Sequence, residues 1–464
     1  MNAGRGEDAV EPSRYLRRLE RLVTALLGRR FEGARDLWRL QLDLLQLQRD
    51  VQMDITQEKA RVGREGVDAD RLAMLRQVFW HARRFGDAIA WVFLKADRRL
   101  LYALAFNQRA PVPPDDHGAR GLVAAAEALS NQGFGFPLLH DITDLLRIGD
   151  LSLITFDSAP RLVEVKTKLI GEWPEGGAKR VSYQISAVWP ESLAPDEQAK
   201  LRNVSGSIPA KGRTRPKPGK RLDRQMRRMT KAHLWGSVEP DLPQEFEGER
   251  IIAARGQATD RPSRWPLIRK LIREARRTTY ASAAVDDAFL YVALYDAEGL
   301  AKDRMAHAMD SLPKDLVSSG IFLEDRSRNS LLTNFVPHAE SGSPQLFLPY
   351  YLYPLPRRAI SDILHGRLLL MNLMNPGRVA EALESEGFSV RPAEGQKGFS
   401  SDPFVVTTEF SDDQGTSYQG QMQNLRMHLD EMVMEFLPLT YLVDVARTMH
   451  QAMQRAASEM AAGA

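Results

Sequence analysis

Two short apolar runs separated by turn-forming residues, within residues 148–168, constrain the fold of this chain more than any other stretch. The runs cover residues 151–156 and 162–165, and each has the length of a β-strand. Between them stands Asp157-Ser158-Ala159-Pro160, whose residue types favour a turn. We therefore predict a β-hairpin around which the rest of the chain is organised.

Three charged residues interrupt the apolar pattern of this hairpin. Asp150 precedes the first run, and Glu164 and Lys166 flank Val165 in the second. Residues two apart in a strand point to the same face, so Glu164 and Lys166 project together while Val165 points into a core. Ionised groups are costly to bury unless something binds them, and a cation held by Asp150 and Glu164 would do so. Oxygen ligands of this kind suit Mg²⁺ or Mn²⁺. The alternative is a surface hairpin with a Glu/Lys pair.

This arrangement resembles the PD-(D/E)XK nuclease superfamily, in which an acidic residue on one strand is followed by a hairpin and then by (D/E)-X-K. The matching residues are Asp150, Glu164 and Lys166, and Gly149 stands where the motif has Pro. The resemblance covers the hairpin closely and residues 118–296 loosely. It implies a restriction-endonuclease-like αβββαβ core in which Asp150 and Glu164 hold Mg²⁺ or Mn²⁺. It also implies that Lys166 orients the attacking water or helps to deprotonate it.

The register of the hairpin decides whether such a site assembles. Opposed residues in an antiparallel hairpin share a face, and their residue numbers keep a constant sum. Asp150 shares a face with Glu164 only if that sum is even, which demands an odd number of loop residues or a bulge. We expect such a register, for example with Ser152 opposite Glu164 and Asp150 opposite Lys166. The two carboxylates are then expected to lie close enough to share one cation.

A strongly basic segment follows the hairpin. Lys and Arg dominate residues 200–231, which contain a single acid, Asp223. Residues 205–220 are predicted to form a loop and 221–233 a helix, a combination that suits the neutralisation of nucleic-acid phosphates. Candidate nucleic-acid-binding residues are Arg213, Arg215, Lys217, Lys220, Arg221, Arg224 and Arg228. Gln225 is a candidate catalytic residue, because nucleases of the resembled fold often carry a Gln or a basic residue on such a helix. The alternative is a solvated basic run.

The overall composition is that of a globular protein, with 464 residues and a formal net charge of only +3. Any nucleic-acid surface must therefore be local. The absence of cysteine excludes disulfides, thiol nucleophiles and Cys-ligated metal sites, and it agrees with a reducing cytoplasm. The N-terminal residues lack the apolar core of a signal peptide, and no apolar stretch is long enough to span a bilayer. We expect a cytoplasmic protein with no membrane partner.

Three domains are predicted: a helical domain at 1–110, a nuclease-like domain at 111–300 with the basic insertion, and an α/β domain at 301–464 that ends in helices. Proline-rich residues 110–116 mark the first boundary. Apolar spacing predicts helices across 12–60 and 70–85, whereas 88–106 fits either helix or strand. The N-terminal helices are expected to pack on each other, and a docking or dimerisation surface is the alternative. Arg83 and Arg84 are interpreted as a solvated pair, with a phosphate contact as the alternative.

The remaining elements follow from similar patterns. A helix at 119–130 precedes the hairpin and a third antiparallel strand covers 179–189. A helix at 265–277 and a strand at 288–295 complete the αβββαβ order, in which either this helix or the basic one is the core helix. Residues 334–356, dense in Pro and aromatic residues, are expected to wrap against the core, with a base-stacking platform as the alternative. The chain from 421 onward is predicted to be helical, with an apolar stripe for a core, an oligomer or a partner protein.

Taken together, these features favour a metal-dependent nuclease that hydrolyses phosphodiester bonds. DNA is favoured over RNA as the substrate, and an endonuclease over an exonuclease. The extra domains suggest a role in antiviral genome defence. The alternatives are an RNA-directed nuclease and a non-catalytic nucleic-acid-binding or scaffold protein on the same fold. The complete Asp/Glu/Lys set argues against the non-catalytic alternative, since a degenerate member usually loses one of these residues.

Overall fold

The computed structural model describes residues 11–28, 33–61, 69–105, 116–155, 160–175, 178–188, 229, 243–246, 249–252, 264–298, 312–337, 347–393, 403–411, 414–422 and 425–463. The chain divides into two compact units: Met1–Ser237 with Glu340–Leu352 (unit 1), and Val238–Ala339 with Tyr353–Ala464 (unit 2). This division differs from the predicted boundaries after residues 110 and 300. Within the described ranges, no helix is both long and apolar enough to cross a membrane.

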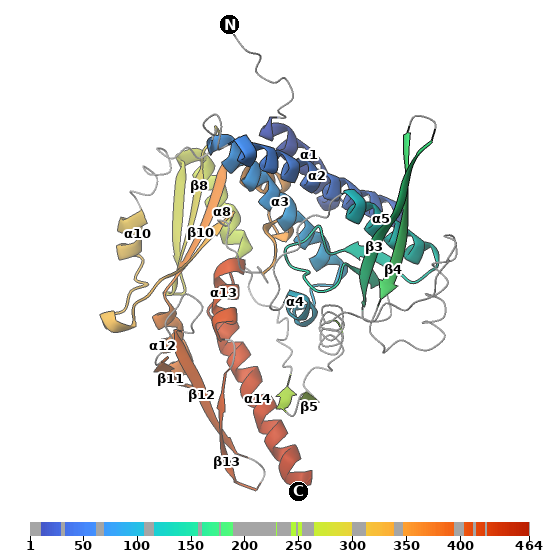
Figure 1. Cartoon of the computed structure of the whole chain (residues 1–464). Coiled ribbons are helices and arrows are strands. Elements are labelled where there is room, and N and C mark those ends of the chain that lie inside the picture. Colours follow the sequence, from blue (N-terminus) through green and yellow to red (C-terminus); the bar gives the residue numbers. More distant parts are fainter. Residues whose placement is uncertain are drawn as a thin grey trace. The chain divides into compact units, whose positions relative to one another are not determined.

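Unit 1 begins with helices that the apolar spacing predicts. They are α1 (Pro12–Leu27), α2 (Ala34–Arg61), α3 (Ala69–Phe93), α4 (Arg98–Ala105) and α5 (Asp116–Asn131). The first three pack on each other (Figure 1) through buried side chains such as Leu19, Leu44 and Leu75. Packing of the N-terminal helices on each other is therefore confirmed. The stretch that fitted either helix or strand is helical and belongs to α3 and α4.

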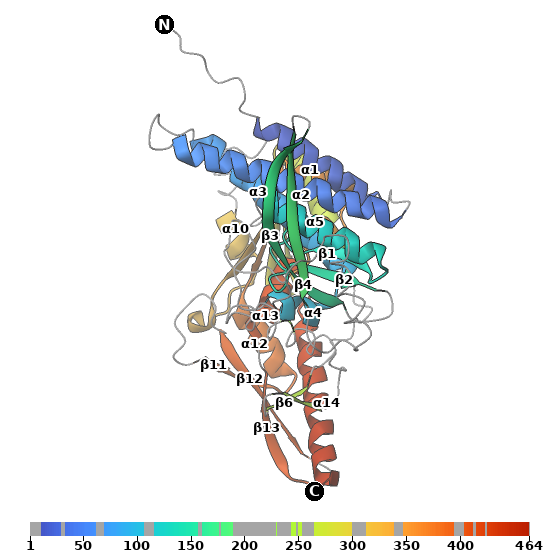
Figure 2. The same ribbon diagram turned by 45° about the vertical axis from the view of Figure 1, so that its right-hand side comes forward.

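A four-stranded sheet follows in the same unit. Its strands are β1 (Phe136–Leu139), β2 (Leu151–Ile154), β3 (Arg161–Glu175) and β4 (Ala178–Val188), in the order β1-β2-β3-β4 with every neighbouring pair antiparallel. Helix α5 packs against β1, β3 and β4, and Figure 2 shows the long β3–β4 hairpin. The predicted hairpin, its preceding helix and its third strand are thus confirmed.

The N-terminal helices and this sheet share one core, which explains why no unit boundary falls near residue 110. Gln41 of α2 is fully buried. Its Nε2 donates to the carbonyl oxygen of Pro137 at 2.9 Å, and its Oε1 accepts from the amide of Leu139 at 3.0 Å. Strand β1 lies at the edge of the sheet, where backbone groups lack a neighbouring strand. The side chain of Gln41 therefore forms hydrogen bonds with backbone groups of β1 that have no partner strand in the described sheet.

Unit 2 is built on a second four-stranded sheet. Its strands are β7 (Tyr280–Val285), β8 (Phe289–Tyr295), β9 (Leu332–Val336) and β10 (Leu368–Met374), in the order β7-β8-β10-β9. Helix α8 (Trp265–Thr278) packs on β7 and β8. Leu290, Val292, Leu294, Met371 and Leu373 form the core of this sheet together with Ile321.

The prediction that residues 265–277 and 288–295 complete the αβββαβ core is wrong, although both were correctly predicted as helix and strand. Strand β8 pairs with β7 on one side, over residues 289–294, and with β10 on the other, over 289–295. A strand with two neighbours has no free edge to offer to the β1–β4 sheet. The described part of unit 1 therefore contains α5 and three antiparallel strands of the expected core, together with β1, which was not predicted, and without the predicted closing helix and strand.

The other elements of unit 2 are β5 (Pro243–Phe246), β6 (Glu249–Ile252), α10 (Leu312–Ser318), η2 (Arg326–Arg328), α11 (Arg357–Leu364), α12 (Pro376–Ser385), β11 (Ser389–Pro392), β12 (Phe404–Ser411), β13 (Ser417–Gln421), α13 (Leu425–Glu435) and α14 (Thr440–Gly463). Strands β11, β12 and β13 form a small antiparallel sheet, on which α14 packs. The apolar stripe of α13, including Leu425, Leu429 and Met432, is buried as the helix packs on β9 and β10. This stripe belongs to the core of unit 2.

The aromatic segment near residue 350 wraps against the protein. Tyr350 and Tyr351 lie in the short helix η3 (Tyr350–Leu352) of unit 1, where they are 1% and 0% exposed. The hydroxyl of Tyr350 lies 2.8 Å from His81 Nδ1, and that of Tyr351 donates to the His81 carbonyl oxygen at 3.1 Å. Rings buried in this way cannot stack on bases, so the alternative of a stacking platform is wrong for these two residues.

Candidate active site

The register of the β2–β3 hairpin brings Asp150 and Glu164 to the same end of the paired residues. Leu151 pairs with Val163, Ser152 with Leu162 and Leu153 with Arg161. Asp150 and Glu164 flank the Leu151–Val163 pair, and the regular pairing ends there because the Asp150 amide donates to the Val163 carbonyl oxygen. The sum of paired numbers is even, as the site requires, and seven residues separate the last pair. The example register, with Ser152 opposite Glu164, is wrong by two residues, because Ser152 pairs with Leu162.

Asp150 lies directly before β2, where the regular pairing of β2 with β3 ends. Its amide donates to the Val163 carbonyl oxygen at 2.9 Å, and its own carbonyl oxygen accepts from the His140 amide at 3.0 Å. Its carboxylate Oδ2 accepts from the backbone amide of Val165 at 2.5 Å. The side chain is thereby held against the residue that follows Glu164. This contact fixes the direction of one carboxylate toward the strand that carries the other.

Glu164 lies in the protein interior, with 6% of its surface exposed. Its β3 neighbours Leu162 and Val163 are also buried, and Val165 is half-buried. A buried carboxylate in a strand needs strong compensation from its surroundings. This environment differs from the polar, unpacked face that the sequence pattern indicated.

Asp141 is a further carboxylate near Glu164 that the sequence analysis missed. Burial raises its pKa to about 6, Arg83 lowers that pKa, and the charge of Glu164 raises it. Asp141 follows β1 directly, after His140. An acidic residue immediately after a buried strand was the available signal.

His140 is a structural residue of this site. Burial lowers its pKa to about 4, so the ring is neutral at pH 7. Its Nδ1 lies 3.1 Å from the carbonyl oxygen of Gly149, and its Nε2 lies 2.7 Å from Ser152 Oγ. A carbonyl only accepts, so Nδ1 carries the proton and Nε2 accepts from the Ser152 hydroxyl. Both nitrogens are occupied, and the ring orients the backbone beside Asp150.

Gly149, the departure from the family motif, has a backbone conformation that proline cannot adopt. Its φ is +78°, whereas the proline ring holds φ near −65°. A Cβ at this position would also lie 3.3 Å from the Val163 carbonyl oxygen. The glycine is therefore required by the turn that brings Asp150 to β3.

The other predicted site residues are described in part or not at all. Lys166 lies in β3, two residues after Glu164 and in register with Ser186, and its side chain lies outside the described residues. Gln225 and the candidate nucleic-acid-binding residues Arg213, Arg215, Lys217, Lys220, Arg221, Arg224 and Arg228 also lie outside them. Met229, next to Arg228, is helical and buried, and its methyl carbon lies 3.8 Å from where a Cβ of Gly149 would be. One residue of the basic segment is thus beside the Asp150 turn.

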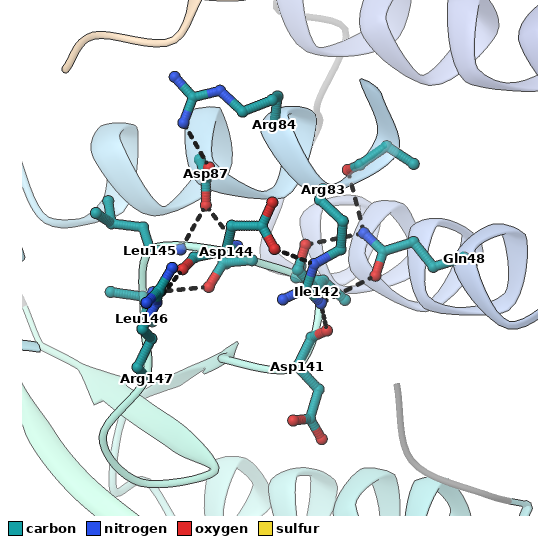
Figure 3. Close-up of polar contacts among 12 residues, drawn as sticks. Gln48, Arg83, Arg84, Asp87, Asp141, Ile142, Asp144, Leu145, Leu146 and Arg147 are labelled. Atoms are coloured by element: carbon teal, nitrogen blue, oxygen red, sulfur yellow. Dashed lines mark hydrogen bonds and ion pairs between the residues drawn. The ribbon is translucent and has the colours of Figure 1, made fainter. Parts of the chain in front are cut away.

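A buried polar cluster holds the loop that leads from β1 to Asp150 (Figure 3). Asp87 of α3 is 0% exposed, and its Oδ1 accepts from the amides of Asp144 and Leu145 at 2.8 and 2.9 Å. Its Oδ2 accepts from Arg84 at 2.8 Å. Burial raises the pKa of Asp87 to about 6, against the lowering effect of Arg84.

A second set of contacts in the same cluster comes from Arg83 and Gln48 (Figure 3). Arg83 donates through Nε to Asp144 at 2.9 Å and through Nη1 to the carbonyl oxygen of Asp141. Gln48 of α2 donates to the carbonyl oxygens of Ala82 and Ile142 at 3.1 and 2.9 Å. Arg83 and Arg84 are each 1% exposed, so their interpretation as a solvated pair is wrong. Their charges are instead used to anchor residues 141–145.

Gly86 allows α3 to approach this loop, and its replacement by alanine is expected to destabilise unit 1. A Cβ at Gly86 would lie 1.8 Å from the carbonyl oxygen of Ile142. In an unobstructed helix interior, glycine to alanine stabilises by about 1 kcal/mol, so the sign of the effect should reverse here to a loss of about 1–3 kcal/mol or more. Thermal unfolding of Gly86→Ala checks this. Gly33→Ala, where the added Cβ meets nothing within 4 Å, is the control. A more stable Gly86→Ala protein would contradict the packing.

Two carboxylates remain the candidate ligand set for a metal. Among the described residues, no group of three or more His, Asp or Glu side chains is placed so that it could hold an ion. Mg²⁺ commonly uses one or two carboxylates together with water and substrate phosphates, so the donor set of Asp150 and Glu164 fits this cation. No protein-family model, no curated protein and no solved structure matches this chain.

Proposed function

We propose that this protein is a metal-dependent nuclease that hydrolyses phosphodiester bonds in DNA, with Asp150, Glu164 and Lys166 as its catalytic residues. One observation carries the proposal: Asp150, directly before β2, accepts from the Val165 amide through Oδ2 and is thereby held against the strand that carries Glu164 and Lys166. A structural hairpin has no need for an acidic side chain held beside a buried glutamate. The same Asp/Glu/Lys set carries the resemblance to the PD-(D/E)XK nucleases.

The proposed roles follow from the chemistry of these groups. Asp150 and Glu164 would hold Mg²⁺ or Mn²⁺, which supplies a water of lowered pKa and polarises the phosphate. The Val165 amide orients Asp150 for this task through its hydrogen bond to Oδ2. Lys166 would orient the attacking water and offset charge that develops on the phosphoryl oxygens.

The basic segment after the hairpin is the proposed DNA-binding surface. Its Lys and Arg residues, from Arg213 to Arg228, would neutralise backbone phosphates. The position of Met229 beside Gly149 supports this, because it brings one residue of the segment next to the turn that carries Asp150. Gln225 would reach the reacting phosphate from the same segment. The proposal extends to endonucleolytic cleavage, and to a cytoplasmic role in genome defence.

Purified full-length protein incubated with covalently closed plasmid, linear single strands and RNA tests this function. Mg²⁺ or Mn²⁺ is expected to support nicking or linearisation of the plasmid, and EDTA to abolish it. Plasmid cleavage identifies an endonuclease, since a closed circle has no ends. Binding of DNA without cleavage in either metal would favour the non-catalytic alternative, and cleavage of RNA alone would make it an RNA-directed nuclease.

A further inference from the structure

A cleft of about 230 Å³ lies between α2 and α3 in unit 1. Its polar lining includes Lys59 of α2, Arg76 and Arg83 of α3, and Asp144 of the loop between β1 and β2. Lys59 and Arg76 are exposed, whereas Arg83 is 1% exposed. The cleft therefore has two cations at its rim and a third at its base.

The cations of this cleft have capacity left for a ligand. Neither Lys59 nor Arg76 forms an ion pair or a hydrogen bond with another described residue. Arg83 uses Nε for Asp144 and Nη1 for Asp141 and Gln48, while its buried Nη2 has no hydrogen-bond partner among the described residues. An unused donor of a buried guanidinium is costly, and Arg83 is one of the residues that line the cleft.

The charge balance of the cleft favours an anion. Among the described residues that line the cleft, Asp144 is the one carboxylate, and it is already paired with Arg83. Within the described part of the chain, that pairing leaves the charges of Lys59 and Arg76 uncompensated. Arginine binds phosphate oxygens through parallel N–H donors, and lysine binds them as a compact charge, so a phosphate group matches this set.

The same cleft has an aromatic wall. Phe79 and Trp80 both line it and are both half-buried. Aromatic side chains beside phosphate-binding cations are the combination that binds nucleotides, because every base has a face on which a ring can stack. The volume suits a single nucleotide unit and excludes a duplex.

We propose that the cleft between α2 and α3 binds one nucleoside phosphate, either free or at the end of a single strand. This inference goes beyond the proposed nuclease function and does not rest on it, since Asp150 and Glu164 do not line the cleft. Lys59, Arg76 and Arg83 bind the phosphate, and Phe79 and Trp80 contact the base. The site is a second, metal-independent place for a nucleotide on the same protein.

Isothermal titration of the full chain with AMP, adenosine, inorganic phosphate and a short 5′-phosphorylated single strand tests this inference. EDTA is present throughout and the protein carries Glu164→Gln, so that the carboxylate site contributes nothing. AMP is expected to bind at least about tenfold more tightly than adenosine or inorganic phosphate, since it alone uses both the cations and the aromatic wall. A strand that binds more tightly than AMP identifies a strand end as the natural ligand, and equal binding identifies a free nucleotide.

Substitutions locate the binding. The double variant Lys59→Gln/Arg76→Gln is expected to weaken AMP binding at least about tenfold, with Phe79→Leu weakening it to a lesser extent. Arg39→Gln removes an exposed cation of α2 that does not line the cleft, and AMP binding should not change. Unchanged affinity in the double variant, an equal loss in Arg39→Gln, or inorganic phosphate binding as tightly as AMP would each overturn the assignment.

Discussion

A Glu164→Gln variant is expected to lose metal-dependent DNA cleavage by at least about a hundredfold, because a neutral amide in place of the carboxylate weakens the hold on the cation. The substitution keeps the size of the side chain, which matters since Glu164 is 6% exposed. It also removes a buried charge, so the melting temperature should stay the same or rise. Initial rates of plasmid nicking over a range of Mg²⁺ concentrations measure the loss.

A matched control separates this effect from a general change in charge. Glu409 is an exposed glutamate of strand β12 in unit 2, and Glu409→Gln should cleave at the wild-type rate. Both variants are assayed at one temperature, below the melting temperature of either, and over the same metal concentrations. Wild-type cleavage by Glu164→Gln would remove Glu164 from the catalytic site and, with it, the main support for the nuclease proposal.

Replacing Asp87 by alanine is expected to lower the stability of unit 1 by about 3–5 kcal/mol, the usual effect of leaving a buried charge without its partner. The variant leaves Arg84, which is 1% exposed, and the backbone amides of residues 144 and 145 without the carboxylate that accepts their hydrogen bonds. The loop that these groups hold leads to Asp150. Thermal and urea unfolding measure the loss, and cleavage should fall with it at temperatures where the loop is released.

Asp70→Ala provides the comparison within the same helix. Asp70 is exposed in the first turn of α3, where a carboxylate contributes at most about 1 kcal/mol through the helix dipole. If Asp87→Ala unfolds no more easily than Asp70→Ala, the cluster does not anchor the loop.

The parity of the hairpin could be predicted because side-chain direction along a strand depends on residue count alone. The exact register could not, since it depends on where the ladder ends. The β2–β3 ladder ends at Asp150, whose carboxylate accepts from the Val165 amide, and the observed register is two residues away from the example predicted. Asp141 escaped prediction for a similar reason, because its proximity to Glu164 depends on how the loop after β1 is held.

By itself the sequence determined most helices of unit 1, the hairpin with its charged positions, and the terminal helices, because hydrophobic period and turn chemistry are local properties. It left α4 and the end of α3 open between helix and strand. Only the tertiary structure decided which elements are neighbours. Strand β8 joins β7 and β10 in unit 2, a choice that its apolar residues do not encode. From the sequence alone, Arg83 and Arg84 were interpreted as solvated charges, whereas both are buried in the folded protein. Their burial depends on the approach that Gly86 permits between segments more than fifty residues apart.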